Sequence, residues 1–164
     1  MAIPIRRVVT GHDLQGRAIV LHDGPAKAYE DLGQAGMTLF DIWRTPDAPA
    51  LIEAAEADPV EVPLDFEIPR RGVRLRYLDY PPAAADAEPF MHRTASIDYA
   101  VVISGEMHML MDDGEVVLRT GDVVVQRGTN HAWVNRGDQT CRMLFVIIGA
   151  ELSPRLAASL KPPP

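Results

Sequence analysis

Residues 121 to 135 read Gly-Asp-Val-Val-Val-Gln-Arg-Gly-Thr-Asn-His-Ala-Trp-Val-Asn, and this stretch decides the fold. Residues 122–126 and 131–135 are rich in β-branched and aromatic side chains, and a polar segment that contains Gly128 separates them. Short apolar runs bounded by glycine and polar residues are typical of β-strands and their turns. The stretch therefore predicts two consecutive β-strands, with His131 where the second strand begins.

Segments of the same kind fill most of the remaining chain. They are Ile5–Val9, Arg17–His22, Met37–Arg44, Val73–Asp79, Asp98–Ile103, Glu106–Met111, Val116–Arg119 and Cys141–Ile148. Many short strands at this spacing, with glycine-containing turns between them, indicate an all-β sandwich or closed barrel.

The length of 164 residues and a content of 47% hydrophobic and 24% charged residues predict one folded domain. Only residues 48–57, between Pro49 and Pro59, have a helical pattern. Residues 80–89 are rich in proline and alanine and are interpreted as an extended connector. We expect N-terminal arm strands and a short helix in residues 1–80, the barrel core in 81–152 and a C-terminal tail in 153–164.

The net charge of −7 excludes nucleic acid as a main partner, because such binding depends on clustered Lys and Arg. The longest apolar run, residues 143–150, is far shorter than the roughly 20 residues needed to span a bilayer, so no membrane partner is expected. A single cysteine, Cys141, and an N-terminus without an apolar leader segment predict a cytoplasmic protein. We expect Cys141 to be buried packing.

Residues 98–111 predict a hairpin with Ser104 and Gly105 as the turn. Antiparallel pairing would then place six side chains on one face, namely Asp98, Ala100, Val102, Met107, Met109 and Met111. An aspartate on such an apolar face is costly unless a charged or hydrogen-bonding group meets it. Asp98 is therefore a candidate functional residue, although a turn cap or a pair with Arg93 are the structural alternatives.

Two stretches together resemble the cupin superfamily, whose first motif is His-x-His, three or four residues, Glu, six residues, Gly. Asp98 stands at the Glu position six residues before Gly105, and His92-Arg93-Thr94 falls on His-x-His. The second motif is Gly, five residues, Pro-x-Gly, two residues, His, three residues, Asn. Gly128, His131 and Asn135 match it, while Gln126 replaces Pro and the gap after Gly121 is one residue short.

The resemblance implies a double-stranded β-helix, or jelly-roll, barrel with a divalent metal such as Fe, Mn, Ni, Cu or Zn at its mouth. The matching ligand positions are His92, Asp98 and His131, whereas Thr94 does not match its histidine. Two imidazoles and one carboxylate leave open positions for substrate or dioxygen on a metal ion.

The expected roles of the site residues follow from these positions. Asp98 and His131 are the candidate catalytic groups, and either would be the general base in a metal-free variant. The candidate substrate-binding residues are Thr94, Met107, Met109, Met111, Asn130 and Trp133. The methionine stripe favours a small apolar or aromatic ligand, with core packing as its structural alternative. His108 is expected on the opposite face, and His12 and His22 have no ligand pattern around them.

The sequence therefore predicts a small-molecule-binding cupin, and first a metal-dependent enzyme of the oxygenase, isomerase or lyase type. The alternative is a ligand-binding or structural cupin that has lost its metal. A homodimer is also expected, because unclosed N-terminal strands present edges that need cover. Neither the substrate nor the reaction follows from the sequence.

Overall fold

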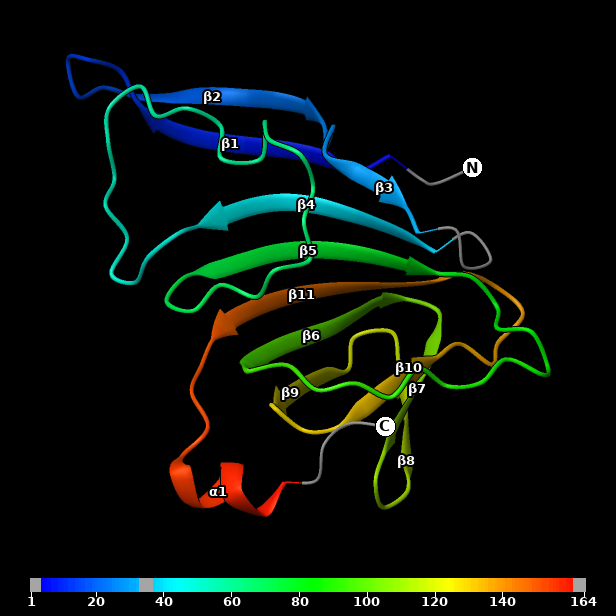
Figure 1. Ribbon diagram of the computed structural model, residues 1–164. Helices are drawn as coiled ribbons and strands as arrows, with labels where there is room; N and C mark the ends of the chain where they lie inside the picture. Colours follow the sequence, from blue (N-terminus) through cyan, green and yellow to red (C-terminus); the bar gives the residue numbers. More distant parts are fainter. Residues whose placement is uncertain (1–3, 33–36, 161–164) are drawn as a thin grey trace.

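A computed structural model describes residues 4–32 and 37–160 (Figure 1). These residues form eleven strands and one short helix. The elements are β1 (Arg6–His12), β2 (Ala18–Pro25), β3 (Tyr29–Asp31), β4 (Thr38–Thr45), β5 (Val73–Tyr80), β6 (Ser96–Ser104), β7 (Glu106–Met111), β8 (Glu115–Arg119), β9 (Val123–Arg127), β10 (His131–Val134), β11 (Cys141–Gly149) and α1 (Pro154–Ser159). The ten predicted strands are all present, and β3 is an additional short one.

The strands form two main sheets and a separate pair. A six-stranded sheet has the order β3-β4-β5-β11-β6-β9, and a three-stranded sheet has the order β10-β7-β8. Figure 1 shows β4, β5, β11 and β6 running side by side across the molecule, with β7, β8 and β10 below them. Among the strands that the structure describes, β1 and β2 pair with each other and with no other strand. This architecture confirms the all-β jelly-roll prediction.

The core lies between the two main sheets. Every second residue of β6 is buried, and this face carries Asp98, Ala100 and Val102. From the other sheet, Met107 and Met109 of β7 join the same apolar cluster. The prediction that these side chains point inward is correct for the five named here, but they come from two facing sheets and not from one face of a hairpin. Met111, the sixth residue of the predicted face, is 37% exposed.

The predicted hairpin of residues 98–111 is wrong in its pairing. The strand β6 pairs with β11 and β9, while β7 pairs with β10 and β8. Gly105 between them has φ +84°, and a Cβ there would lie 2.9 Å from the Cα of Cys141. The glycine thus lets the chain turn from one sheet into the other at close range.

The barrel begins earlier in the chain than the expected residue 81. The strand β5 pairs along its full length with β11, and β4 pairs with β5. Residues 38–45 and 73–80 are therefore integral to the barrel sheet.

The predicted helix over residues 48–57 is wrong, because the structure has turns and irregular backbone there. Leu51 and Ile52 are 77% and 74% exposed, so no packing partner supports a helix too short to be stable alone. The short helix is instead α1, in the segment expected as a tail, where the Ser153 side chain accepts a hydrogen bond from Leu156 N. Residues 161–164, also expected as tail, lie outside the described residues.

Among the residues that the structure describes, no helix is long and apolar enough to cross a membrane.

Candidate functional site

A cavity of about 890 Å³ lies between the six-stranded sheet and β10. Five predicted site residues line it, namely His92, Thr94, Asp98, His131 and Trp133. Further walls come from β5 and β11, through Arg76, Leu78, Tyr80, Phe145 and Ile147, and from Phe66 and Phe90. The cavity is therefore mostly apolar, with a few titratable groups.

His92 and His131 lie side by side in the cavity wall. Each backbone N–H donates to the carbonyl oxygen of the other residue at 2.9 Å. The two imidazole rings lie 4.4 Å apart between centroids. The isolated bridge thus fixes both rings against each other.

His131 is almost fully buried, and its Nδ1 has two polar neighbours. The Thr129 carbonyl oxygen and the Gln126 Nε2 each lie 3.0 Å from Nδ1. Burial lowers the pKa of His131 to about 4, and the nearby His92 acts in the same direction. His131 is therefore a neutral imidazole at neutral pH, and the Nδ1 partner sets whether Nε2 carries the proton.

His92 is held in a similar way, with its ring at the cavity wall. Its Nδ1 lies 3.1 Å from the carbonyl oxygen of Phe90. The phenyl ring of Phe90 stacks on the imidazole at 5.3 Å between centroids. A proton on Nδ1, donated to this carbonyl, leaves the Nε2 of His92 as an acceptor.

Asp98 is a buried carboxylate on β6, next to the edge strand β9 of the six-stranded sheet. It pairs with Ile147 of β11 on one side and Gln126 of β9 on the other, and it is 7% exposed. Its Oδ1 has no hydrogen-bond partner among the described residues. Burial raises the pKa of the Asp98 carboxyl, against the opposing effects of Ser96 and His92. Such an oxygen is costly for the fold and available to a ligand.

Aromatic rings continue the wall beyond the two histidines. Trp133 meets His131 edge-on at 5.3 Å and Phe145 edge-on at 5.6 Å. Such ring contacts form a rigid apolar surface. This surface suits the body of a small apolar or aromatic ligand.

Arg76 is a buried, charged residue of the cavity lining that the sequence motifs do not indicate. It lies on β5, directly opposite Phe145 of β11, and is 3% exposed. The sequence predicts residues 1–80 to be arm strands that pack on the barrel, whereas Arg76 lies within the barrel sheet. The alternation of arginines with apolar residues in Val73–Tyr80 is the signal that could have indicated a polar inner face.

Comparison with known proteins decides the family. The model of the cupin domain matches residues 76–147. The chain is 34% identical over 155 residues to the cupin-domain-containing oxidoreductase fogC of Aspergillus ruber, covering 87% of this chain and 71% of the relative. The chain belongs to the cupin superfamily.

Two further relatives are also from fungi. The cupin-domain-containing oxidoreductase srdB of Neurospora crassa is 31% identical over 154 residues, covering 87% of this chain and 72% of the relative. The phomopsin biosynthesis cluster protein D of Diaporthe leptostromiformis is 49% identical over 82 residues, covering 49% of this chain and 42% of that relative.

The cupin motif residues around His131 have structural roles. Asn135 donates from Nδ2 to the carbonyl oxygens of Tyr80 and Gln139, both at 2.7 Å, and accepts from Gly137 N at 2.9 Å. Gly128 has φ +62°, the left-handed region that favours glycine. Gln126, in place of the motif's proline, accepts from Gly128 N at 2.7 Å and reaches His131 with its amide nitrogen. These contacts hold the turn that presents His131.

The cupin resemblance implies a bound metal. The residues present have suitable donor atoms for it, but their side chains are not arranged as a metal site. Two imidazoles with backbone-bonded Nδ1 atoms and one unpartnered carboxylate oxygen are suitable donors. Within residues 4–32 and 37–160, however, no group of three or more His, Cys, Asp or Glu side chains is arranged to hold a metal ion. The ligand set of His92, Asp98 and His131 therefore stays a prediction.

The remaining predicted substrate-binding residues lie outside the cavity lining. Met107 and Met109 are buried in the core, because their strand packs against β6 and β11. Met111 is 37% exposed at the end of β7 and lines a shallow separate hollow. Asn130 points to the exposed Asp112, donating to its Oδ1 at 2.7 Å. Thr94, which does line the cavity, accepts from Ser96 Oγ at 2.8 Å.

The other histidines and the cysteine lie outside the cavity lining. His108 contacts Arg136 and Glu115, and His22 lies 3.6 Å from Asp58. Cys141 is fully buried in the core cluster, as predicted, and burial raises its thiol pKa to about 11.

Proposed function

We propose that this cupin is an enzyme of the isomerase or lyase type that moves a proton on a small apolar or aromatic molecule. One observation supports this proposal most directly. The unpartnered Oδ1 of Asp98 and the rings of His92 and His131 line the same cavity, which is mostly apolar. Convergent titratable groups in an apolar pocket favour proton-transfer chemistry.

Asp98 is the proton acceptor in this proposal. A carboxylate that burial has made more basic than one in water is a stronger general base. It removes a proton from an acidic C–H of the bound substrate, and the neutral carboxyl that results is better tolerated at a buried position. The same proton returns to a different atom of the substrate in an isomerisation or leaves with a hydroxyl group in an elimination.

His131 binds and polarises the substrate oxygen. When Nδ1 accepts a hydrogen bond from the amide of Gln126, the proton resides on Nε2, which donates toward the cavity. A neutral imidazole donor stabilises the negative charge that develops on a substrate carbonyl when the adjacent C–H loses its proton. His92, in ring contact with His131, orients it.

Proton exchange with a carbon acid tests this function. Phenylpyruvate has an aromatic ring and acidic benzylic protons, and NMR follows their replacement by deuterium in D₂O. We expect the protein to accelerate exchange over the protein-free rate and Asp98→Asn to abolish the acceleration. Asp98→Glu, which keeps the carboxylate, should retain part of it. Equal exchange with wild-type protein, the Asn variant and no protein would overturn the proposal for this substrate class.

A metal-dependent oxidoreductase is the second candidate function, and it is favoured by the relatives fogC and srdB, which are named cupin-domain-containing oxidoreductases. Its predicted ligands are His92, Asp98 and His131. Metal analysis of protein purified without added ions separates the two candidates. Stoichiometric metal that is lost in His131→Ala supports the oxidoreductase, and metal-free protein that accelerates exchange supports proton transfer.

A further inference from the structure

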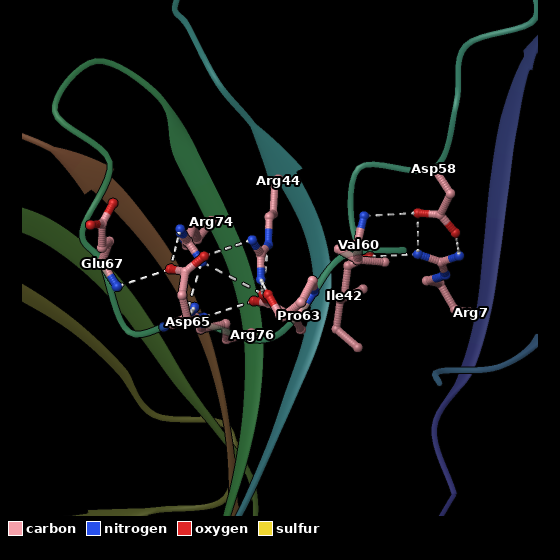
Figure 2. Close-up of polar contacts among 11 residues, drawn as sticks. Arg7, Ile42, Arg44, Asp58, Val60, Pro63, Asp65, Glu67, Arg74 and Arg76 are labelled. Carbon is pink, nitrogen blue, oxygen red and sulfur yellow. Dashed lines mark hydrogen bonds and ion pairs between the residues drawn. The ribbon is translucent and has the colours of Figure 1, made fainter. Parts of the chain in front are cut away.

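A group of arginine and aspartate side chains lies beside the cavity, and we call it the Arg–Asp cluster. Its members are Asp41 and Arg44 of β4, Arg74 and Arg76 of β5, and Asp65. Figure 2 shows Arg44, Arg74 and Arg76 converging on Asp65 from two adjacent strands. The same view shows a second pair, Arg7 of β1 with Asp58, which lies beside β1 on the other side of β4.

The three arginines of the cluster share its two aspartates, but they do not contact them equally. Asp41 is fully buried and meets Arg44 at 2.6 Å, Arg76 at 2.8 Å and Arg74 at 3.6 Å. Arg44 and Arg74 also contact the Asp65 carboxylate, at 2.8 and 2.6 Å. Arg76 instead bonds the backbone carbonyl of Asp65. Three guanidinium groups against two carboxylates leave one excess positive charge.

Arg76 is the cluster member that lines the cavity. It uses Nε for Asp41 and Nη2 for the carbonyl of Asp65, and Nη1 has no acceptor among the described residues. A guanidinium fixed by two bonds is preorganised to donate its remaining N–H groups. Such a donor in a mostly apolar pocket suits an anionic group of a ligand.

The strand register relates this cation to the acid–base groups. Arg76 lies opposite Phe145 of β11, and Asp98 lies opposite Ile147, two residues farther along β11. Two strand spacings and a two-residue step separate the backbones of Arg76 and Asp98 by roughly 12 Å. The side chains of Phe145 and Ile147 lie in the cavity wall between them. A molecule with one aromatic ring can therefore contact both.

We infer that the cavity selects apolar molecules that carry an anionic group such as a carboxylate, which Arg76 binds through Nη1. This inference rests on the proposed function in one respect, because both place the ligand in the same cavity. It adds a substrate class: an aromatic or aliphatic acid whose charged end lies at β5 and whose reactive carbon lies near Asp98.

The acidic residues of the cavity wall do not compete with this arrangement. Glu30 and Asp31 of β3 also line the cavity, and both are exposed. Water and salt screen exposed charges, whereas Arg76 is buried. Asp98, the third acidic residue of the wall, is also buried, and its backbone lies roughly 12 Å from that of Arg76. An anionic group of a ligand is therefore favoured beside Arg76, away from Asp98.

Matched ligands test the inference without requiring turnover. Phenylpyruvate and phenylacetone share the aromatic ring, the benzylic CH₂ group and the ketone next to it. The ketone carbon carries a carboxylate in phenylpyruvate and a methyl group in phenylacetone. We expect calorimetry to give at least about tenfold tighter binding of phenylpyruvate to the wild-type protein. Arg76→Gln should remove this preference while leaving phenylacetone affinity unchanged.

Arg44→Gln is the matched control, because it removes the same charge from the Arg–Asp cluster at a residue outside the cavity lining. It should keep the preference. In Arg76→Gln, Asp41 retains Arg44 and Arg74, so the fold is expected to persist. If that variant does not fold, a crystal structure of the wild-type protein with bound phenylpyruvate tests the contact. The inference predicts that the carboxylate of phenylpyruvate lies against Nη1 of Arg76.

Equal affinities of the wild-type protein for the two ligands would overturn the inference. So would a preference that survives in Arg76→Gln or disappears equally in Arg44→Gln, or a bound carboxylate elsewhere. The binding measurements are repeated in Asp98→Asn. A carboxylate preference without proton exchange would contradict the proposed function alone, and exchange without a preference would contradict this inference alone.

Discussion

His92 and His131 exchange both of their backbone hydrogen bonds at 2.9 Å, and their rings lie 4.4 Å apart. The segment before β6 is thereby tied to the first residue of β10, so the two histidines share one wall of the cavity. Backbone pairing sets the ring positions more firmly than side-chain contacts alone could. The following predictions depend on this wall and on the groups that face it.

The burial of His131 predicts a pH-dependent loss of stability. Its pKa is about 4 in the folded protein, against about 6.5 when unfolded, so the unfolded chain binds the proton more readily. The contribution of His131 to stability is therefore complete above about pH 6.5 and falls as the pH falls toward 4. We expect the free energy of unfolding, measured with urea, to fall between pH 7.5 and pH 4.5 in both proteins. The fall should be up to about 3 kcal/mol smaller in His131→Gln than in the wild type. Parallel losses in both proteins would contradict this assignment.

Asp98 should have the opposite pH dependence. Because burial raises its pKa, the folded protein binds this proton more readily than the unfolded chain, and stability is lost as the pH rises through the raised pKa. Asp98→Asn should therefore unfold at a higher urea concentration than the wild type at pH 8. The difference should shrink at pH 4. A variant that is less stable than the wild type at pH 8 would show that the carboxylate has a stabilising partner.

We expect the replacement of Asn135 to lower the stability of the fold. Its buried side chain makes three hydrogen bonds that join β5 to the turn before β11. Asn135→Ala leaves buried backbone groups unpaired and should lower the free energy of unfolding by about 3 kcal/mol. The control is Asn130→Ala, whose amide bonds the exposed Asp112 and whose loss should cost about 1 kcal/mol or less. Equal losses in urea unfolding would refute the role of Asn135.

Much of this site could be predicted from the residues around Gly105 and His131. The alternation of β6 placed Asp98 on the buried face, and the motif placed His92 and His131 on one wall. The pairing of β6 could not be predicted, because a glycine between two strands fits a hairpin as well as a turn between sheets. The place of Arg76 in the cavity could not be predicted, because it depends on the pairing of Arg76 with Phe145, which is distant in the sequence.

The alternating methionines of β7 show the same limit of prediction from the sequence. Alternation correctly predicted that Met107 and Met109 face inward, yet it could not separate packed core from open cavity. That difference depends on which side chains fill the space opposite them. The helix predicted at residues 48–57 is absent for a related reason, because Leu51 and Ile52 are mostly exposed in the part of the chain that the structure describes.

We propose that the protein is a homodimer. The strands β1 and β2 form a two-stranded sheet with exposed Val8 and Val20, and such a sheet is only marginally stable without cover. Light scattering should give about twice the chain mass of 18.0 kDa. A mass equal to that of one chain would rule the dimer out.

The deuterium exchange rate of phenylpyruvate, measured on chelator-treated protein, tests the central claim most directly. The claim is that Asp98 transfers the proton in this cavity, so we predict that metal-free wild-type protein accelerates exchange. Asp98→Asn should bind phenylpyruvate with unchanged affinity and show only the protein-free rate. Exchange that requires added metal, or that persists in Asp98→Asn, would contradict the account.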